Sequence, residues 1–162
     1  MISSSLAHPW RIQSQLCGME VELMGMLERE QRGLVYAADI TIGDVEAIDS
    51  FLTARTARPA RAERGSDERQ VARSVRAALI HVVGTLQHAL PLSRETVEDI
   101  DAQRYLRLQV QGAWNTLWAL VSPWQSHDEY DHERWRHVKY WDAEQEAEGK
   151  SLLAHALDRN AK

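Results

Sequence analysis

Apolar residues recur at three- and four-residue spacing along most of this chain, and this period restricts its possible folds more than any other feature. The first example spans residues 10–32, where the apolar side chains fall within roughly a third of the helical wheel. They are Ile12, Leu16, Met19, Leu23, Met26 and Leu27. Pro9 suits the first turn of such a helix, and Gly33 suits its C-terminal end. The spacing therefore predicts an amphipathic helix over residues 10–32.

Two further helical patterns lie on either side of a polar connection. The second pattern begins at Asp44 and fades before Pro59, because the residue before a proline is pushed out of the α region. Residues 56–66 are rich in Arg and predict an exposed connection. Ser66 is a favourable N-cap for the third helix, which we expect Pro91 to stop. Its apolar positions are Val71, Val75, Ala78, Leu79, Val82, Leu86 and Leu90.

The C-terminal half of the sequence predicts one long helix and two shorter ones. Ser93 is the expected N-cap of the long helix, and Pro123 its expected end. Its apolar seam runs through Val97, Ile100, Gln103, Leu106, Val110, Ala113, Leu117 and Leu120. A polar link over residues 125–131 leads to a fifth helix, and Gly149 separates that helix from a short final one. The fifth helix carries Trp135, Val138 and Trp141, and the final one Leu152, Leu153, Ala156 and Leu157.

Together these patterns predict an all-α protein, a single helical domain over residues 1–162 that forms one bundle of five to six helices. Residues 34–42 are compatible with a short extended piece, which is too little for a sheet. Cys17 is the only cysteine, so no intramolecular disulfide is available, as is typical of a reducing compartment. The sequence has no signal-peptide pattern and no apolar run near the ~20 residues that span a bilayer. We therefore expect a cytoplasmic protein without membrane contact.

The formal charge of −5 is unevenly distributed. Between residues 55 and 76, seven arginines stand against three acids, a local balance of +4. These arginines are Arg55, Arg58, Arg61, Arg64, Arg69, Arg73 and Arg76. Residues 128–148 have a local balance of −5, with eight acids against three bases. The basic segment indicates a solvated connector, a site for phosphates or nucleic acid, or a surface that docks on an acidic protein.

Tryptophans are concentrated in the C-terminal half, where five of the six fall between residues 114 and 141. They are Trp114, Trp118, Trp124, Trp135 and Trp141. Trp114 and Trp118 flank the apolar seam of the long helix, which indicates a helix that is apolar on more than one face. Because tryptophan is enriched at binding hot spots, we interpret this cluster as a partner-binding surface.

Acidic and histidine residues are concentrated in residues 127–137, where metal binding is the first chemistry to consider. His127/Asp131 and Glu133/His137 are i,i+4 pairs, which would share one face of a helix and suit zinc, iron or manganese. The two pairs point in different directions on one ideal helix, so we expect no metal site there. No Gly-rich phosphate loop is present in the sequence, and we expect no cofactor.

The run Arg76-Ala77-Ala78-Leu79-Ile80-His81 places an arginine and a histidine five residues apart on the third helix. This Arg-x4-His spacing resembles the signature of HEPN-type helical ribonucleases. The resemblance implies a metal-independent ribonuclease that pairs two such motifs across a dimer, with Arg76 and His81 as its catalytic residues.

A second resemblance covers residues 126–135, Ser-His-Asp-Glu-Tyr-Asp-His-Glu-Arg-Trp. This stretch is similar to the His-Pro-Asp-Tyr…Trp tails of small actinobacterial and actinophage proteins. It implies no activity.

The sequence favours a non-enzymatic interaction or regulatory module. We expect it to self-associate, as a homo-oligomer, or to bind a protein partner through its tryptophan-rich C-terminal half. The alternatives are the HEPN-like ribonuclease and nucleic-acid binding through the arginines of residues 55–76.

Overall fold

A computed structural model describes residues 33–95 and 99–160. Within these ranges lie four α-helices and three short 3-10 turns, with no strand, so the all-α class is confirmed. The helices are α2 (Ile42–Ala57), α3 (Asp67–Arg94), α4 (Ile100–Val121) and α5 (Ala143–Asn160), and the turns are η1 (Ala37–Asp39), η2 (Pro59–Arg61) and η3 (Ser122–Trp124). The described part thus has four helices and not the five to six expected. The helix expected over residues 10–32, Cys17 and Val97 lie outside the described residues.

Helix α2 begins two residues earlier than the sequence pattern predicts, because Thr41 caps it. The Thr41 side chain accepts a hydrogen bond from the Asp44 amide at 3.1 Å, and the Asp44 carboxylate accepts one from the Thr41 amide at 2.7 Å. This reciprocal capping box satisfies two amide groups that a helix start leaves without partners. The preceding residues, considered for an extended piece, contain the η1 turn and bury Leu34, Ala37 and Ile40.

Helix α3 begins as predicted at its Ser66 cap but continues through Pro91 to Arg94, so the predicted stop at Pro91 is wrong. Proline lacks only one amide donor, and here it lies in the last turn, where few further helical bonds depend on it. The Ser93 hydroxyl donates to the Leu90 carbonyl at 2.8 Å inside α3 and does not cap α4. Asp99 caps α4 by accepting from the amides of Asp101 and Ala102.

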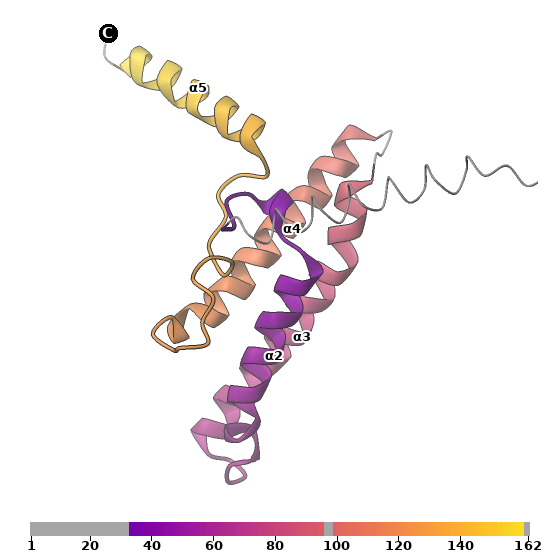
Figure 1. Ribbon diagram of the computed structural model, residues 1–162, viewed down its shortest axis with the longest axis vertical. Coiled ribbons are helices and arrows are strands. Elements are labelled where there is room, and N and C mark those ends of the chain that lie inside the picture. Colours follow the sequence, from indigo (N-terminus) through magenta and orange to yellow (C-terminus); the bar gives the residue numbers. More distant parts are fainter. Residues whose placement is uncertain (1–32, 96–98, 161–162) are drawn as a thin grey trace, which may run out of the picture. The chain divides into compact units, whose positions relative to one another are not determined.

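The core lies where α3 packs against both α2 and α4 (Figure 1). Leu79 and Leu117, central to the two predicted seams, are 2% and 0% exposed. The outer ends of those seams are not buried, because Val71 and Ile100 are 63% and 78% exposed. The other fully buried large side chains of the three helices are Val45, Ile48, Leu52, Leu86, Leu90, Val110, Trp114 and Val121.

Residues 125–142 form an irregular segment packed on the bundle, so the predicted fifth helix is wrong. Its backbone groups are bonded by side chains of α4. Asn115 donates from Nδ2 to the Val138 carbonyl and accepts at Oδ1 from the Val138 amide, both at 2.9 Å. Trp114 Nε1 donates to the Arg136 carbonyl at 2.8 Å, and Gln111 Nε2 donates to the Lys139 carbonyl at 2.5 Å. These bonds from α4 side chains take the place of the backbone hydrogen bonds that a helix would supply.

Helix α5 continues through Gly149, which was expected to divide it. A Cβ atom at Gly149 would lie 3.2 Å from a ring carbon of Tyr140, so glycine lets the helix pass close to that ring. The large apolar residues beyond Gly149 are exposed: Leu152, Leu153 and Leu157 are 66%, 61% and 61% accessible. None of the helices in the described ranges combines the length and apolarity needed to cross a membrane.

Candidate interaction surfaces

Three of the five clustered tryptophans belong to the core. Trp114, Trp135 and Trp141 are 0%, 6% and 6% exposed, and a partner could not touch them without rearrangement of the bundle. Trp118 and Trp124 are half-buried, and the Trp118 ring meets the His137 ring edge-on at 5.3 Å between centroids. The tryptophans thus serve mainly to pack residues 125–142 against α4. They leave little indole surface for a partner.

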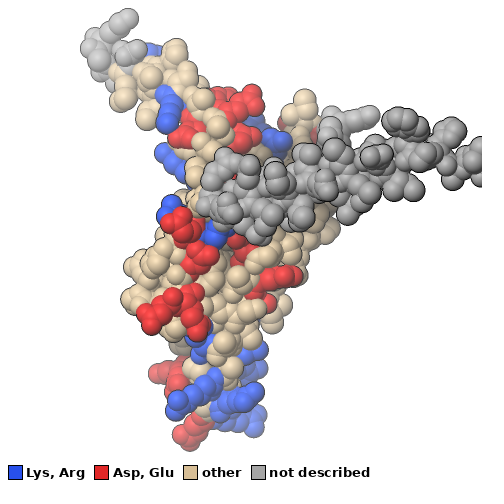
Figure 2. Space-filling view, in the orientation of Figure 1, with Lys and Arg blue, Asp and Glu red and all other residues tan. Residues whose placement is uncertain are grey.

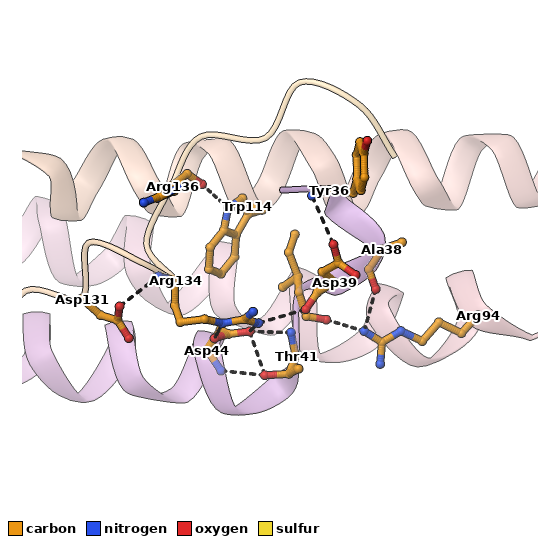
Figure 3. A network of polar contacts seen from close by, with 11 residues as sticks. Tyr36, Ala38, Asp39, Thr41, Asp44, Arg94, Trp114, Asp131, Arg134 and Arg136 are labelled. Carbon is orange, nitrogen blue, oxygen red and sulfur yellow. Dashed lines mark hydrogen bonds and ion pairs between the residues drawn. The ribbon is translucent and has the colours of Figure 1, made fainter. Parts of the chain in front are cut away.

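Beside these indoles, Arg134 and Asp44 form a buried ion pair that sequence reasoning missed (Figure 3). Arg134 also donates from Nη2 to the Asp39 carbonyl at 3.0 Å, and Asp44 accepts from the hydroxyl of Thr41. The hydrogen bond to Asp44 raises the pKa of Arg134 above its usual value. The Thr41–Asp44 capping box is readable in the sequence, but nothing local identifies Arg134 as its partner. The network joins residues 125–142 to the start of α2, which is a structural role.

A second polar cluster holds one of the predicted basic residues, Arg55. Its Nη2 atom donates to the Glu129 carboxylate at 2.8 Å and lies 2.9 Å from His127 Nε2. Its guanidinium carbon lies 3.3 Å from the centroid of the Phe51 ring. The hydrogen bond from Arg55 lowers the pKa of Glu129. Arg55 is therefore engaged within the chain and does not belong to a free basic surface.

The residues that were considered as metal ligands are not brought together. His127, Asp131, Glu133 and His137 lie in the irregular segment, so the helical spacing that would pair them is lost. Asp131 instead accepts from the amides of Glu133 and Arg134, both at 2.9 Å. Within residues 33–95 and 99–160, no three His, Cys, Asp or Glu side chains are grouped to hold a metal ion.

Arg76 and His81 both lie on α3, as predicted. Five residues of helix turn the chain by about 140°, so the two side chains leave α3 in different directions. Arg76 is half-buried and His81 is exposed, and no hydrogen bond between them occurs in the described part of the chain. A ribonuclease site built from this motif would need groups from elsewhere.

The remaining arginines of residues 55–76 lie on the connection between α2 and α3 and on the first turns of α3, and Figure 2 shows a group of basic side chains at this end of the hairpin. We call this set the basic end; it comprises Arg58, Arg61, Arg64, Arg69, Arg73 and Arg76. Arg58, Arg61, Arg64 and Arg73 are exposed. Within the described residues, Arg69 is the one member of the set whose side chain makes a hydrogen bond, from Nη1 to the Ala62 carbonyl at 3.3 Å, and no ion pair there involves the set.

A groove of 310 Å³ lies between α4 and the start of α5. Arg104, Arg107, Asp142, Glu144 and Glu148 supply its charged lining. Trp141 forms part of the groove wall, and the Arg107 guanidinium carbon lies 5.3 Å from the centroid of its ring. Because bases and acids line the same open groove, it favours no single class of ligand.

Comparisons with protein-family models, with curated proteins and with solved structures find no match for this chain. The geometry of its own surfaces is therefore the basis for any functional inference.

Proposed function

We propose that this protein is a non-enzymatic interaction module that self-associates through the exposed apolar face of α5. This face consists of Leu152, Leu153, Ala156 and Leu157. The exposure of its three leucines, each above 60%, is the observation that carries the proposal. Burial of the tryptophans favours this face over the indole cluster as the contact surface in the C-terminal half.

Helix α5 is attached to the rest of the chain near its start, which supports a partner for its second half. The contacts that hold α5 to the rest of the chain lie near its start: Tyr36 donates to Glu146 at 2.8 Å, and the Trp141 amide donates to Gln145 at 2.5 Å. Beyond Gly149, the assigned bonds in the described residues stay within α5, as from Lys150 to Glu146 and from His155 to the Ser151 carbonyl. Most helical stability in proteins comes from packing of an apolar face, and the leucines in this half of α5 are mostly exposed.

A second copy of the chain fits this face by symmetry. The four apolar positions are spaced symmetrically about their midpoint. In an antiparallel pair of α5 helices, Leu152 therefore lies opposite Leu157, and Leu153 lies opposite Ala156. The same pairing is repeated on the other side of a two-fold axis, as an isologous dimer requires. Leucine then meets leucine in one pair and the smaller alanine in the other, an arrangement that allows close packing. A different protein partner is the alternative occupant.

Sedimentation equilibrium of the full chain over a range of concentrations tests the proposal. We expect wild type to dimerise, and Leu153→Glu/Leu157→Glu to be monomeric with unchanged helicity. The matched control is Val71→Glu/Ile80→Glu, which places two charges on exposed apolar positions of α3, 63% and 75% accessible, and should leave the dimer intact. A monomeric wild type at high micromolar concentration, or a dimer unaffected by the α5 changes, would refute self-association through α5.

A further inference from the structure

We propose that the basic end binds the phosphate backbone of a nucleic-acid duplex. The proposal concerns a different surface from α5 and does not depend on self-association. It starts from the arginines Arg58, Arg61 and Arg64, which follow one another at three-residue spacing along the α2–α3 connection and are all exposed. Arginine donates in a planar fork that matches the oxygens of a phosphate group.

These guanidinium groups are not neutralised inside the chain. Three acids share the region, namely Glu63, Asp67 and Glu68, all of them exposed. Six arginines against these three acids leave a balance of +3 at the basic end, on a chain whose formal charge is −5. Arg55 is excluded from this balance because Glu129 holds it. A positive surface on an acidic protein is a local attraction for polyanions.

The connection that carries the arginines is an ordered turn. The Ser66 hydroxyl donates to the Glu63 carbonyl at 2.9 Å, and Gln70 donates from Nε2 to the Gly65 carbonyl at 3.3 Å. Gly65 has a φ of +94°, a conformation that side-chain-bearing residues rarely adopt. Arg69 adds its bond to the Ala62 carbonyl. Such bracing lowers the entropy lost when the arginines engage a ligand.

The composition of this end distinguishes a duplex from other acidic partners. Across residues 58–76, the only apolar side chains larger than alanine or proline are Val71, which is 63% exposed, and the half-buried Val75, whereas protein interfaces are built around a larger apolar centre. No Phe, Trp or Tyr occurs between Phe51 and Tyr105, so this end has no aromatic platform of the kind on which single-stranded bases stack. A surface with many arginines, one exposed valine and no aromatic side chain matches backbone contacts, which position a protein on a duplex without reading its sequence. DNA and RNA duplexes share this phosphate chemistry.

Fluorescence anisotropy of the full chain with labelled duplexes tests the proposal. The probes are a DNA duplex, an RNA duplex of the same sequence and the corresponding single strands. We expect wild type to bind a duplex more tightly than either single strand. Affinity should fall roughly 100-fold between about 50 and 200 mM salt if four phosphates are contacted. The relative affinities of the DNA and RNA probes identify which duplex is preferred.

The decisive variant is Arg58→Gln/Arg61→Gln/Arg64→Gln. Each lost phosphate contact should reduce the logarithmic salt slope by about 0.9. Arg104→Gln/Lys139→Gln/Arg159→Gln is the matched control, because it removes the same charge from exposed positions outside the basic end. It should bind within about twofold of wild type. Circular dichroism melts confirm that both variants fold. Absence of duplex binding at low salt, equal weakening by both variants, or equal competition by poly-glutamate would overturn the proposal.

Discussion

Arg134 bonds both carboxylate oxygens of Asp44, from Nε at 2.9 Å and from Nη2 at 2.6 Å, and each side chain is only 8% exposed. The pair joins two parts of the chain that lie 90 residues apart. Because the carboxylate also closes the capping box at Thr41, one buried group fixes both the start of α2 and the segment that follows α4.

Replacing Arg134 by methionine should therefore lower the free energy of unfolding by about 3–5 kcal/mol, since the Asp44 carboxylate stays buried without its cation. Urea denaturation measures the loss. Arg136→Met is the control, because Arg136 is exposed and should change stability by less than about 0.5 kcal/mol. Equal effects of the two changes would argue against the buried pair as a structural tie.

Asn115→Ala should release the Val138 backbone from α4. The change removes two hydrogen bonds and leaves an amide and a carbonyl without partners, at a cost of about 1–3 kcal/mol. Hydrogen exchange at the Val138 amide should accelerate. The neighbouring Thr116→Ala is the control, since the Thr116 hydroxyl bonds only to Gly112 within α4. Unchanged protection of Val138 in the Asn115 variant would contradict the assigned contact.

Trp114→Ala should lower the free energy of unfolding by about 3–5 kcal/mol, as expected for a large side chain with no exposed surface. Leu152→Ala, at a residue that is 66% exposed, should change monomer stability by less than about 0.5 kcal/mol. Thermal or urea unfolding at dilution, where association does not contribute, makes this comparison. A larger loss of stability in Leu152→Ala than in Trp114→Ala would contradict the burial of Trp114 and the exposure of Leu152.

The attachment of α5 should weaken in acid. Hydrogen bonds from Lys150 and Tyr36 lower the pKa of Glu146 below its ordinary value of 4.5. A lowered pKa in the folded state means that the stabilisation is complete above the unfolded pKa and is lost as the pH falls through the folded one. NMR titration of residues 143–147 should follow this loss. Glu146→Gln should abolish it, whereas Glu144→Gln, at an exposed neighbour, should not.

The ribonuclease alternative makes a separate prediction. Because His81 is exposed and has no bond to Arg76 in the described part, we expect no metal-independent cleavage of RNA by wild type. His81→Ala should leave the melting temperature unchanged. Cleavage in the presence of EDTA that is lost in His81→Ala, with folding intact, would replace the interaction proposal by an enzymatic one.

Features that depend on neighbouring residues in the sequence could be predicted, and features set by distant ones could not. Ser66 identifies the start of α3 because an N-cap acts within one turn. Pro91 misled because the loss of one backbone bond does not by itself stop a helix, and α3 continues to Arg94. Trp135, Val138 and Trp141 have helical spacing and are buried, yet they do not form a helix. The Trp135 carbonyl accepts from the Tyr130 hydroxyl, Asn115 bonds the Val138 backbone, and the Trp141 carbonyl accepts from the Ala38 amide. Three-residue spacing cannot distinguish these cases.

The same limit applies to the candidate surfaces. Counting charges found the arginine-rich segment, but only the fold separates Arg55, which pairs with Glu129 from a distant segment, from the arginines of the basic end. The tryptophan cluster is equally obvious in the sequence, yet the exposure of each indole depends on how residues 125–142 pack against α4.

Three side chains of α4 bond the backbone of residues 136–139 and not its side chains. They belong to Gln111, Trp114 and Asn115. The exposed side chains of Arg136 and Lys139 can therefore diverge in evolution without loss of these backbone bonds. The constraint falls on the three positions of α4, where the length and polarity of each side chain must be kept. Selection for a new binding property could thus act on Arg136 and Lys139 while the scaffold beneath them stays the same.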